Sequence, residues 1–187
     1  PPALDTNFQF RLAVEGRFSA IALGVGLAEK YMGEHAGRIP LILKLNGKTN
    51  IADDAEAVSP AFASVEDAVR LGADAVGYTV YVGSPRQDVE IREYGKVRQE
   101  CERFGMPLVV WAYPRGRDIE AKGGKGTLFA QDYAARVSEE LGADVVKLHE
   151  PPAEDALPPH RRRPASLRDD VVDVLDEDEI AVERGQV

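Results

Sequence analysis

A lysine near the end of a short apolar run is the residue in this sequence best placed to do chemistry. Lys147 follows two valines in a segment bounded by Gly142 and Pro151, which predicts a short buried β-strand. An ammonium in such a strand is costly to bury unless it is paired or deprotonated. One interpretation is a structural lysine that extends to solvent or pairs with Glu150. The other is an amine with a lowered pKa that attacks a carbonyl and forms a Schiff base.

The groups around this lysine are expected to come from the ends of the preceding strands. Apolar runs at 39–45, 73–82 and 106–113 predict three further strands, and segments with helical patterns separate them. This alternation predicts a parallel sheet with right-handed crossovers, in which the carboxyl ends of all strands lie at one edge. The residues expected there are Lys44, Asn46, Lys48, the stretch from Tyr78 to Ser84, Trp111, Tyr113, Arg115, Lys147, His149 and Glu150.

Each of these residues also has a structural interpretation. Trp111 and Tyr113 are of types that commonly pack in a core, Lys48 is typical of a solvated turn, and Asn46 with the next glycine is an ordinary turn dipeptide. Together, however, a strand-end lysine, a phenol and further cations would form a site for amine catalysis on an anionic substrate. Lys44 would be a second ammonium that lowers the pKa of the first if the two lie close together.

Caps and apolar stripes predict the helices between these strands. Ser64 followed by Asp67 is close to a capping box, and Thr127 is expected to cap a helix that ends near Leu141. Helices are also predicted over 17–32 and 87–104, and loops over 1–12, 51–62 and 117–126. The predicted stripes are Val65, Ala68, Val69 and Leu71; Tyr94, Val97, Cys101 and Phe104; and Phe129, Tyr133, Val137 and Leu141.

An internal repeat supports the same architecture. The sequence Leu-Gly-Ala-Asp at 71–74 recurs at 141–144, and each copy is followed by an apolar pair. A separation of 70 residues suits two βα units. The repeat and the reactive residue at a strand's carboxyl end predict part of a (β/α)8 barrel, with an open doubly wound sheet as the alternative.

Composition excludes several classes of protein. The chain has 187 residues, 44% of them hydrophobic, which is enough for one globular domain. Its net charge is −9, which argues against a nucleic-acid partner. Its single cysteine, Cys101, and its three unpaired histidines form no metal-binding pattern. We therefore expect no metal, no membrane span and a cytoplasmic location, with this cysteine in the core.

The two ends of the chain differ from this central part. From Asp169 onward there are eight acidic residues and one basic residue, a local net charge of −7 that leaves about −2 for the rest. We predict a partial barrel domain over residues 1–151 and an irregular acidic tail over 152–187, with 171–175 as one weak strand or a helical turn. The start at Pro1-Pro2 without an initiator methionine suggests a fragment or a processed start.

Four segments resemble one known family. They occur in order at the spacing of βα units and read LKLNG (43–47), GYTVYVGS (77–84), VWAYPRG (110–116) and GADVVK (142–147). Together they resemble the archaeal-type (DhnA-like) class I fructose-bisphosphate aldolases, over roughly residues 5–151. The resemblance implies a (β/α)8 barrel, here about strands three to six, in a protein that forms homo-oligomers.

The resemblance also implies an activity and its residues. Members of this family use no metal or other cofactor and cleave or form fructose 1,6-bisphosphate. By resemblance Lys147 forms a Schiff base with the sugar phosphate, Tyr113 transfers the proton, and Trp111 lines the site; Lys44 and Arg115 are the cations expected to bind substrate. Nothing after Pro151 resembles the family's phosphate-binding loops. A related Schiff-base aldolase or transaldolase-like synthase acting on another sugar phosphate, and a non-catalytic remnant, are the alternatives.

Overall fold

The computed structural model describes residues 5–149 and 174–175. Within these ranges six strands form one sheet in the order β5-β4-β3-β2-β1-β6, and every neighbouring pair is parallel. The strands are β1 (Ala20–Gly24), β2 (Leu41–Lys44), β3 (Ala75–Val80), β4 (Leu108–Ala112), β5 (Val145–Lys147) and β6 (Val174–Leu175). The helices are α1 (Thr6–Glu15), α2 (Val25–His35), α3 (Val65–Arg70), α4 (Gln87–Phe104), α5 (Arg117–Glu120) and α6 (Leu128–Glu140).

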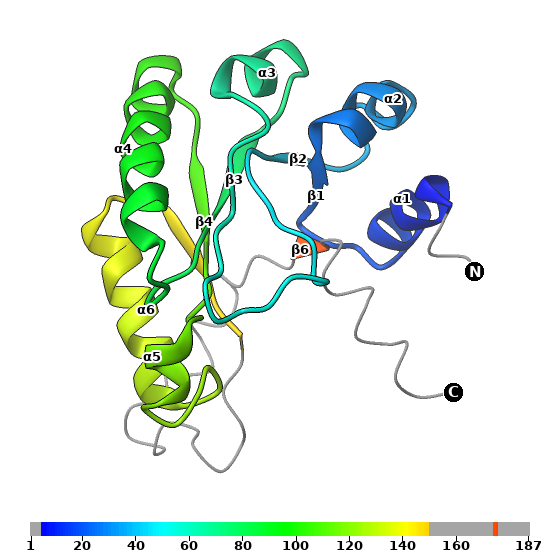
Figure 1. Ribbon diagram of the computed structural model, residues 1–187. Coiled ribbons are helices and arrows are strands. Elements are labelled where there is room, and N and C mark those ends of the chain that lie inside the picture. Colours follow the sequence, from blue (N-terminus) through cyan, green and yellow to red (C-terminus); the bar gives the residue numbers. More distant parts are fainter. Residues whose placement is uncertain (1–4, 150–173, 176–187) are drawn as a thin grey trace, which may run out of the picture.

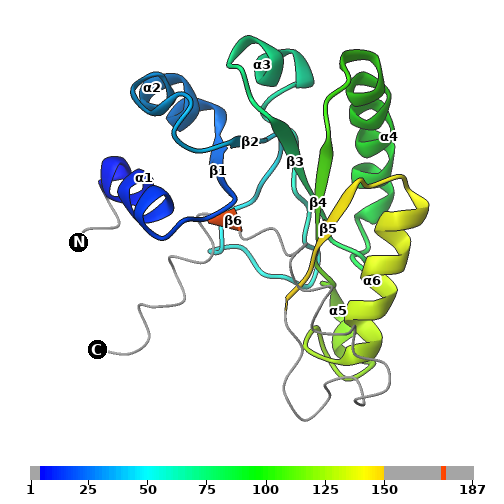
Figure 2. The ribbon, with the colours of Figure 1, turned by 180° about the vertical axis from the view of Figure 1, so that it is seen from behind.

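The sheet curves, and the helices lie around its outer side as in part of a barrel (Figures 1 and 2). The outer face of the sheet packs against these helices through a large apolar cluster that includes Leu43, Tyr78 and Val110. A smaller cluster that includes Ile42 and Trp111 lies on the inner face. Because side chains alternate along a strand, Lys44 and Thr79 also belong to the inner face. The partial (β/α) barrel predicted from the sequence is confirmed.

The internal repeat has a structural cause at the amino-terminal ends of the strands. The carboxylate of Asp74 accepts a hydrogen bond from the backbone N–H of Leu41 at 2.9 Å, and the carboxylate of Asp144 accepts one from Leu108 at 2.8 Å. Each aspartate also donates its own backbone N–H to the carbonyl of the same leucine. The two leucines are the first residues of β2 and β4. Each repeat therefore fixes the start of one strand against the start of its neighbour.

Three predictions for the amino-terminal half and the glycine-rich loop were wrong. The helix predicted over 17–32 is β1 followed by α2, because residues 20–24 hydrogen-bond to β2 and are almost entirely buried. The loop predicted over 1–12 contains α1, which Asp5 caps by accepting a hydrogen bond from the N–H of Asn7 at 3.0 Å. The loop predicted over 117–126 begins with α5. The sequence predicted about four strands and missed β1, which precedes the first of them.

Most of the predicted helix signals are present, but the predicted stripes include exposed residues. Val69 on α3 is 45% exposed, and Phe104 at the end of α4 is 36% exposed. The capping box between Ser64 and Asp67 forms, and Thr127 caps α6. The stripe predicted for α6 was wrong in its first half, because Phe129 and Tyr133 are 58% and 55% exposed. The small residues Ala130, Ala134 and Ser138 face the sheet instead. Small side chains let this helix lie close to its strands.

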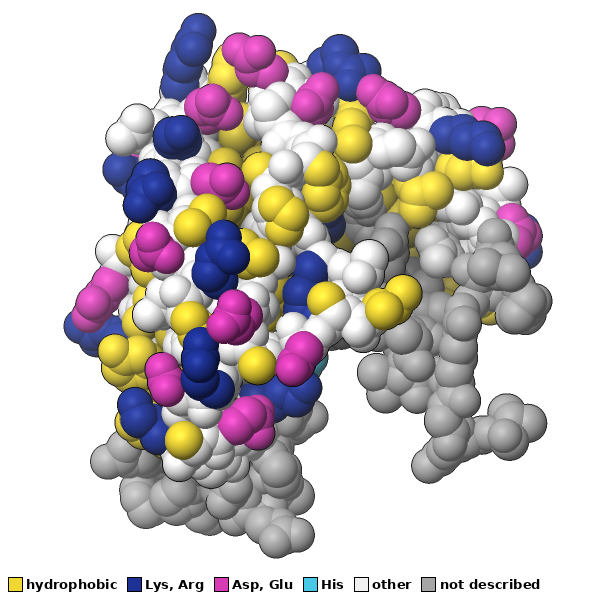
Figure 3. Space-filling view, in the orientation of Figure 1, with side chains coloured by type: hydrophobic (Ala, Val, Ile, Leu, Met, Phe, Trp, Pro, Cys, Tyr) yellow, Lys and Arg dark blue, Asp and Glu magenta, His cyan; other side chains and the backbone are white. Residues whose placement is uncertain are grey.

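The remaining predictions concern the surface, the core cysteine and the tail. Cys101 is buried, as predicted, and burial raises the pKa of its thiol to about 12. Acidic and basic side chains are interspersed on the helical face seen in Figure 3. No helix in the described ranges is long and apolar enough to cross a bilayer. Of the tail predicted over 152–187, the structure describes only β6, which pairs with β1; the rest lies outside the described residues.

Candidate active site

The amine of Lys147 and the phenol of Tyr113 lie together at the carboxyl edge of the sheet. Lys147 is the last residue of β5, and Tyr113 directly follows β4, the neighbouring parallel strand. The Nζ atom of Lys147 lies 3.5 Å from the phenol Oη of Tyr113. The lysine is partly buried and the tyrosine almost fully so. A primary amine and a group able to donate or accept a proton are therefore within reach of one substrate atom.

A buried indole lies beneath this pair and carries a second ammonium. Trp111 is fully buried and stands opposite Lys147 in the register of β4 and β5. The Nζ of Lys44 lies 4.0 Å from the centroid of the indole, and the Nζ of Lys147 lies 5.9 Å from it. Lys44 also donates a hydrogen bond to the Thr79 hydroxyl at 2.9 Å. Both ammonium groups thus share one aromatic ring, which favours cations at its face.

The Tyr113 ring is held by two neighbouring side chains. The imidazole of His149 stacks on it with 4.3 Å between ring centroids and 13° between the ring planes. The guanidinium carbon of Arg115 lies 5.4 Å from the same ring. Stacking and cation–π contacts restrict the orientation of the phenol, so that its hydroxyl stays directed toward the lysine.

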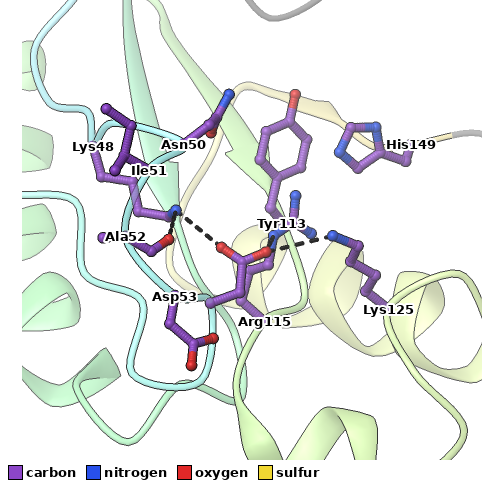
Figure 4. A pocket seen from close by; sticks show the side chains of 10 residues that line it. Lys48, Asn50, Ile51, Ala52, Asp53, Tyr113, Arg115, Lys125 and His149 are labelled. Atoms are coloured by element: carbon purple, nitrogen blue, oxygen red, sulfur yellow. Dashed lines mark hydrogen bonds and ion pairs between the residues drawn. The ribbon is translucent and has the colours of Figure 1, made fainter. Parts of the chain in front are cut away.

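A cavity of about 590 Å³ adjoins this tyrosine (Figure 4). It is lined by Lys48, Asn50, Ile51, Ala52, Asp53, Asp54, Tyr113, Arg115, Lys125 and His149. Three cationic side chains of this lining form ion pairs with the carboxylate of Asp54. The N···O distances are 2.9 Å for Lys48, 3.2 Å for Arg115 and 3.4 Å for Lys125. Partial burial alone would raise the pKa of Asp54. The hydrogen bond from Lys48 and the charges of all three cations outweigh burial and lower that pKa.

A second cavity, of about 630 Å³, adjoins Lys44 on the inner face. Its lining includes Lys44, Lys48, Thr79, Gly24 and Phe62. Lys48 therefore lines both cavities, and its segment, residues 46–64, lies between them. The path of that segment decides how much space a substrate finds around the two ammonium groups.

Buried polar side chains fix the path of this segment. Glu90, fully buried on α4, accepts hydrogen bonds from the backbone N–H of Ser59 at 2.6 Å and of Tyr81 at 2.8 Å. Burial raises the pKa of Glu90 to about 7, although these two backbone hydrogen bonds favour its charged form. The amide of Asn46, also fully buried, donates to the carbonyls of Ser59 and Thr79 at 3.0 and 2.8 Å. The segment is therefore attached both to α4 and to the end of β3.

The structure brings together all five site residues predicted from the sequence. Lys147, Tyr113, Trp111, Lys44 and Arg115 lie at one edge, linked by the contacts given above. The roles predicted for them, and the lowering of the lysine pKa by its neighbour, stay predictions. Pairing of the lysine with Glu150 concerns a residue outside the described ranges.

Two expectations for this edge were wrong. The side chain of Lys48 is not solvated, since it is only 10% exposed and paired with Asp54. The phenol of Tyr78 lies on the helix side of the sheet, where its hydroxyl donates to Glu93 at 3.4 Å, and it takes no part in the site.

Sequence reasoning missed three residues of this edge: Asp54, Glu90 and Lys125. Asp54 and Lys125 belong to segments without a periodic pattern, so no sequence signal marks them. A glutamate on the buried side of the 87–104 helix was a usable signal for Glu90, because such a residue seldom stays buried without partners. Across the described part of the chain, no group of three or more His, Cys, Asp or Glu side chains is placed to hold a metal ion.

Comparisons with known proteins agree with this geometry. A family model for the DeoC/LacD family aldolases matches residues 4–171. Fructose-bisphosphate aldolase class 1 of Thermoproteus tenax is 43% identical over 148 residues, which are 79% of this chain and 54% of that protein. The fructose-bisphosphate aldolase/6-deoxy-5-ketofructose 1-phosphate synthase of Methanocaldococcus jannaschii is 32% identical over 148 residues, covering 76% of this chain and 46% of that protein.

A solved structure is similar over the same part of the chain. It is an archaeal fructose-1,6-bisphosphate aldolase whose catalytic lysine is covalently bound to the carbinolamine intermediate of the substrate. The similarity has a TM-score of 0.68 and 41% sequence identity, and it covers 76% of this chain and 54% of that one. The chain spans about half the length of the relatives it matches. The extent of the family match and the identity to these relatives place the chain in the DeoC/LacD family of aldolases.

Proposed function

We propose that the protein is a class I aldolase that cleaves or forms fructose 1,6-bisphosphate through a Schiff base on Lys147. The observation that carries this proposal is the 3.5 Å approach of the lysine amine to the Tyr113 hydroxyl at the carboxyl edge of a parallel sheet. Catalytic groups of (β/α)8 enzymes lie at this edge. The names of the matched relatives support the same chemistry.

The proposed chemistry begins with attack of the lysine amine on the C2 ketone of the sugar. Loss of water gives an iminium ion, which accepts the electron pair of the C3–C4 bond when that bond breaks. The proton of the C4 hydroxyl leaves to a base, and the aldehyde half departs. Tyr113 is the proposed group that moves the proton, and it returns one to C3 of the resulting enamine. Water then hydrolyses the imine and frees dihydroxyacetone phosphate.

Lys44 and Arg115 are the proposed substrate-binding cations, and Trp111 supports Lys44. The ring of Trp111 holds the ammonium of Lys44 beside the reacting amine, and Arg115 faces the cavity next to Tyr113. A sugar phosphate is an anion, so cations on both sides of the Schiff-base carbon suit it. We further infer a homo-oligomer by analogy with the family. A cytoplasmic location is inferred because a lone buried thiol suits a reducing compartment.

Trapping of the imine tests the proposal directly. The chain is incubated with dihydroxyacetone phosphate and cyanoborohydride, and the modified peptide is identified by mass spectrometry. We expect one adduct on Lys147 that is lost in Lys147→Ala, while Lys96→Ala, which removes an exposed lysine of α4, retains it. A folded native chain with no adduct on Lys147 would favour the non-catalytic remnant instead.

A second sugar phosphate remains a specific alternative within the same chemistry. The Methanocaldococcus jannaschii relative bears two names, and one of them is a synthase of 6-deoxy-5-ketofructose 1-phosphate. The two names differ in the sugar phosphate, and in this proposal the Schiff-base lysine serves either activity. Turnover assays with fructose 1,6-bisphosphate and with other ketose phosphates distinguish them, because the true substrate has the highest kcat/KM.

A further inference from the structure

Glu90 of α4 has no exposure to solvent, and no step of the proposed chemistry uses it. Its two carboxylate oxygens bind two different parts of the chain. Oε1 accepts a hydrogen bond from the backbone N–H of Ser59 at 2.6 Å, and Oε2 accepts one from that of Tyr81 at 2.8 Å. An ionised carboxylate accepts at both oxygens, whereas protonation makes one of them a donor. The two N–H groups therefore match the ionised form.

The hydrogen bond to Ser59 fixes the position of Lys48. The carbonyl of Ser59 accepts a hydrogen bond from the amide of Asn46 at 3.0 Å, and the carbonyl of the next residue, Pro60, accepts one from the backbone N–H of Gly47 at 3.3 Å. Lys48 directly follows Gly47 and lines both cavities of the site. A displacement of Ser59 thus moves the segment that lies between these cavities.

The hydrogen bond to Tyr81 fixes the strand end beside the catalytic phenol. The carbonyls of Val80 and Val82, on either side of Tyr81, accept hydrogen bonds from the backbone N–H groups of Tyr113 and Arg115 at 3.0 and 3.1 Å. The guanidinium carbon of Arg115 also lies 5.9 Å from the centroid of the Tyr81 ring. One carboxylate in the helical layer therefore joins two segments that border the site.

The surroundings of Glu90 favour a mixture of its two protonation states near neutral pH. Burial raises its pKa to about 7; the hydrogen bonds from Tyr81 and Ser59 oppose this shift, and the charge of Glu93, one turn further along α4, adds to it. From β3 the phenol of Tyr78 faces the same region, with its hydroxyl 3.4 Å from the Glu90 carbonyl. Burial and the two glutamates raise the pKa of this phenol as well, so it stays neutral while Glu90 titrates.

We propose that Glu90 is a positioning residue for the active site. Its ionised carboxylate holds residues 46–64 and the end of β3 in the arrangement that binds the sugar phosphate, and its protonation releases one of the two attachments. Affinity for the substrate then rises with pH, because the substrate favours the form with both attachments. This inference rests on the proposed function and adds to it a control of substrate affinity by a side chain outside the site. The competing explanation is a buried carboxylate that supports the fold alone.

Steady-state cleavage of fructose 1,6-bisphosphate at pH 6 and pH 8 separates these explanations. Glu90→Gln is neutral at both values and retains one acceptor oxygen, so it reproduces the protonated form. We expect its KM to be about tenfold above the native value at pH 8 and within about twofold of it at pH 6, with kcat within about threefold throughout. Glu90→Met, which has no acceptor oxygen, should raise KM at both values. Glu100→Gln, on the same helix, keeps both hydrogen bonds of Glu90 and is the matched control, with native KM at both values.

The outcomes for this inference and for the proposed function are distinct. A KM ratio between Glu90→Gln and the native chain that is the same at pH 6 and pH 8 overturns the inference, and so does a loss confined to kcat. Absence of both turnover and an adduct on Lys147 overturns the proposed function instead.

Hydrogen–deuterium exchange of the native chain decides the inference in that case, and also where neither variant folds. Protection of the amides of residues 46–64, corrected for intrinsic exchange, should rise about threefold or more from pH 6 to pH 8, because the second attachment forms as Glu90 ionises. A rise in the native chain and in Glu100→Gln supports the inference. Protection that stays constant in the native chain, or that rises equally in a folded Glu90→Gln protein, overturns it.

Discussion

The six-membered ring of the Trp111 indole fills the space where Gly77 of β3 has no side chain. A Cβ atom on Gly77 would lie 2.5 Å from Cζ3 and 2.8 Å from Cη2 of that ring, and 3.1 Å from Cδ of Lys44. The backbone of this residue is ordinary β-strand, so its need for glycine is one of space. The missing side chain at Gly77 thus leaves the space that both the indole and the Lys44 side chain occupy.

Gly77→Ala is expected to destabilise the protein by about 1–3 kcal/mol, because the indole and the Lys44 side chain cannot both keep their positions. Urea unfolding measures the loss, and the emission of the single tryptophan reports the displaced ring. Gly95→Ala in α4 is the matched control, since its Cβ would meet no atom within 4 Å. The unfolding free energy of that variant should equal the native value or exceed it by up to about 1 kcal/mol, because alanine favours a helix. Equal unfolding curves for the two variants would contradict the assignment.

Tyr113→Phe should separate formation of the imine from proton transfer. The phenyl ring can still stack on His149, whereas the hydroxyl 3.5 Å from Lys147 is lost. We expect trapping of dihydroxyacetone phosphate to persist and kcat for cleavage to fall about 10²- to 10⁴-fold. Tyr133→Phe, at an exposed position of α6, should retain native kcat. A Tyr113→Phe protein with undiminished kcat would assign the proton transfer to another group.

Glu90 is expected to make stability depend on pH near neutrality. Its folded-state pKa of about 7 lies above the ordinary value of 4.5, so the folded protein retains this proton longer than the unfolded chain does. The stabilising contribution is full below about pH 4.5 and is lost as the pH rises through about 7. Relative to Glu90→Gln, the native protein should therefore lose about 2–4 kcal/mol of unfolding free energy over this window.

Urea unfolding of the two proteins at several pH values checks the Glu90 prediction. The informative quantity is the change of their difference with pH, because the amide also alters the hydrogen bonds to Ser59 and Tyr81. Glu139→Gln, at an exposed position of α6, should show no such change. A difference that stays constant from pH 4.5 to 7.5 would refute the raised pKa.

Asp54→Asn is expected to destabilise the protein in a pH-dependent way. Removal of the shared carboxylate leaves Lys48 and Arg115 without it, so unfolding free energy at pH 7 should fall by about 1 kcal/mol after allowance for solvent screening. The pKa of Asp54 is lowered, so its contribution is present above the ordinary value of 3.8 and is lost as the pH falls through the folded pKa.

Urea unfolding at pH 7 and at lower pH measures this loss, with Asp132→Asn at an exposed position of α6 as the control. Unfolding curves for Asp54→Asn that match the native protein at pH 7 would contradict the prediction.

The pattern of the sequence was sufficient for the strands that bear Lys147 and Tyr113. Each lies in or directly after an apolar run between glycine or proline residues, and parallel strands place such residues at one edge. The segment Ala20–Gly24 was mistaken for helix because a short apolar run has no period that separates a buried strand from a buried helix.

The ion pairs of the cavity beside Tyr113 could not be predicted from such patterns. Asp54 lies in a segment whose path is set by distant groups, including Glu90 and Ser84, whose hydroxyl donates to the carbonyl of Ala57. Such contacts depend on the completed fold and leave no local period or cap. The same holds for Lys125, whose partner Asp54 is 71 residues away in sequence.

The hydrogen bonds of Asp74 and Asp144 at the start of the strands determine which face of the sheet the residues at the far ends point to. Successive side chains of a strand point to opposite faces, so a slip of β5 by one residue would turn the amine of Lys147 from the barrel interior toward the helices. Asp144, three positions earlier, prevents that slip by holding both the N–H and the carbonyl of Leu108. A carboxylate at the amino-terminal edge of the sheet thus sets the register of β5 against β4. That register determines which face of the sheet the Lys147 amine points to.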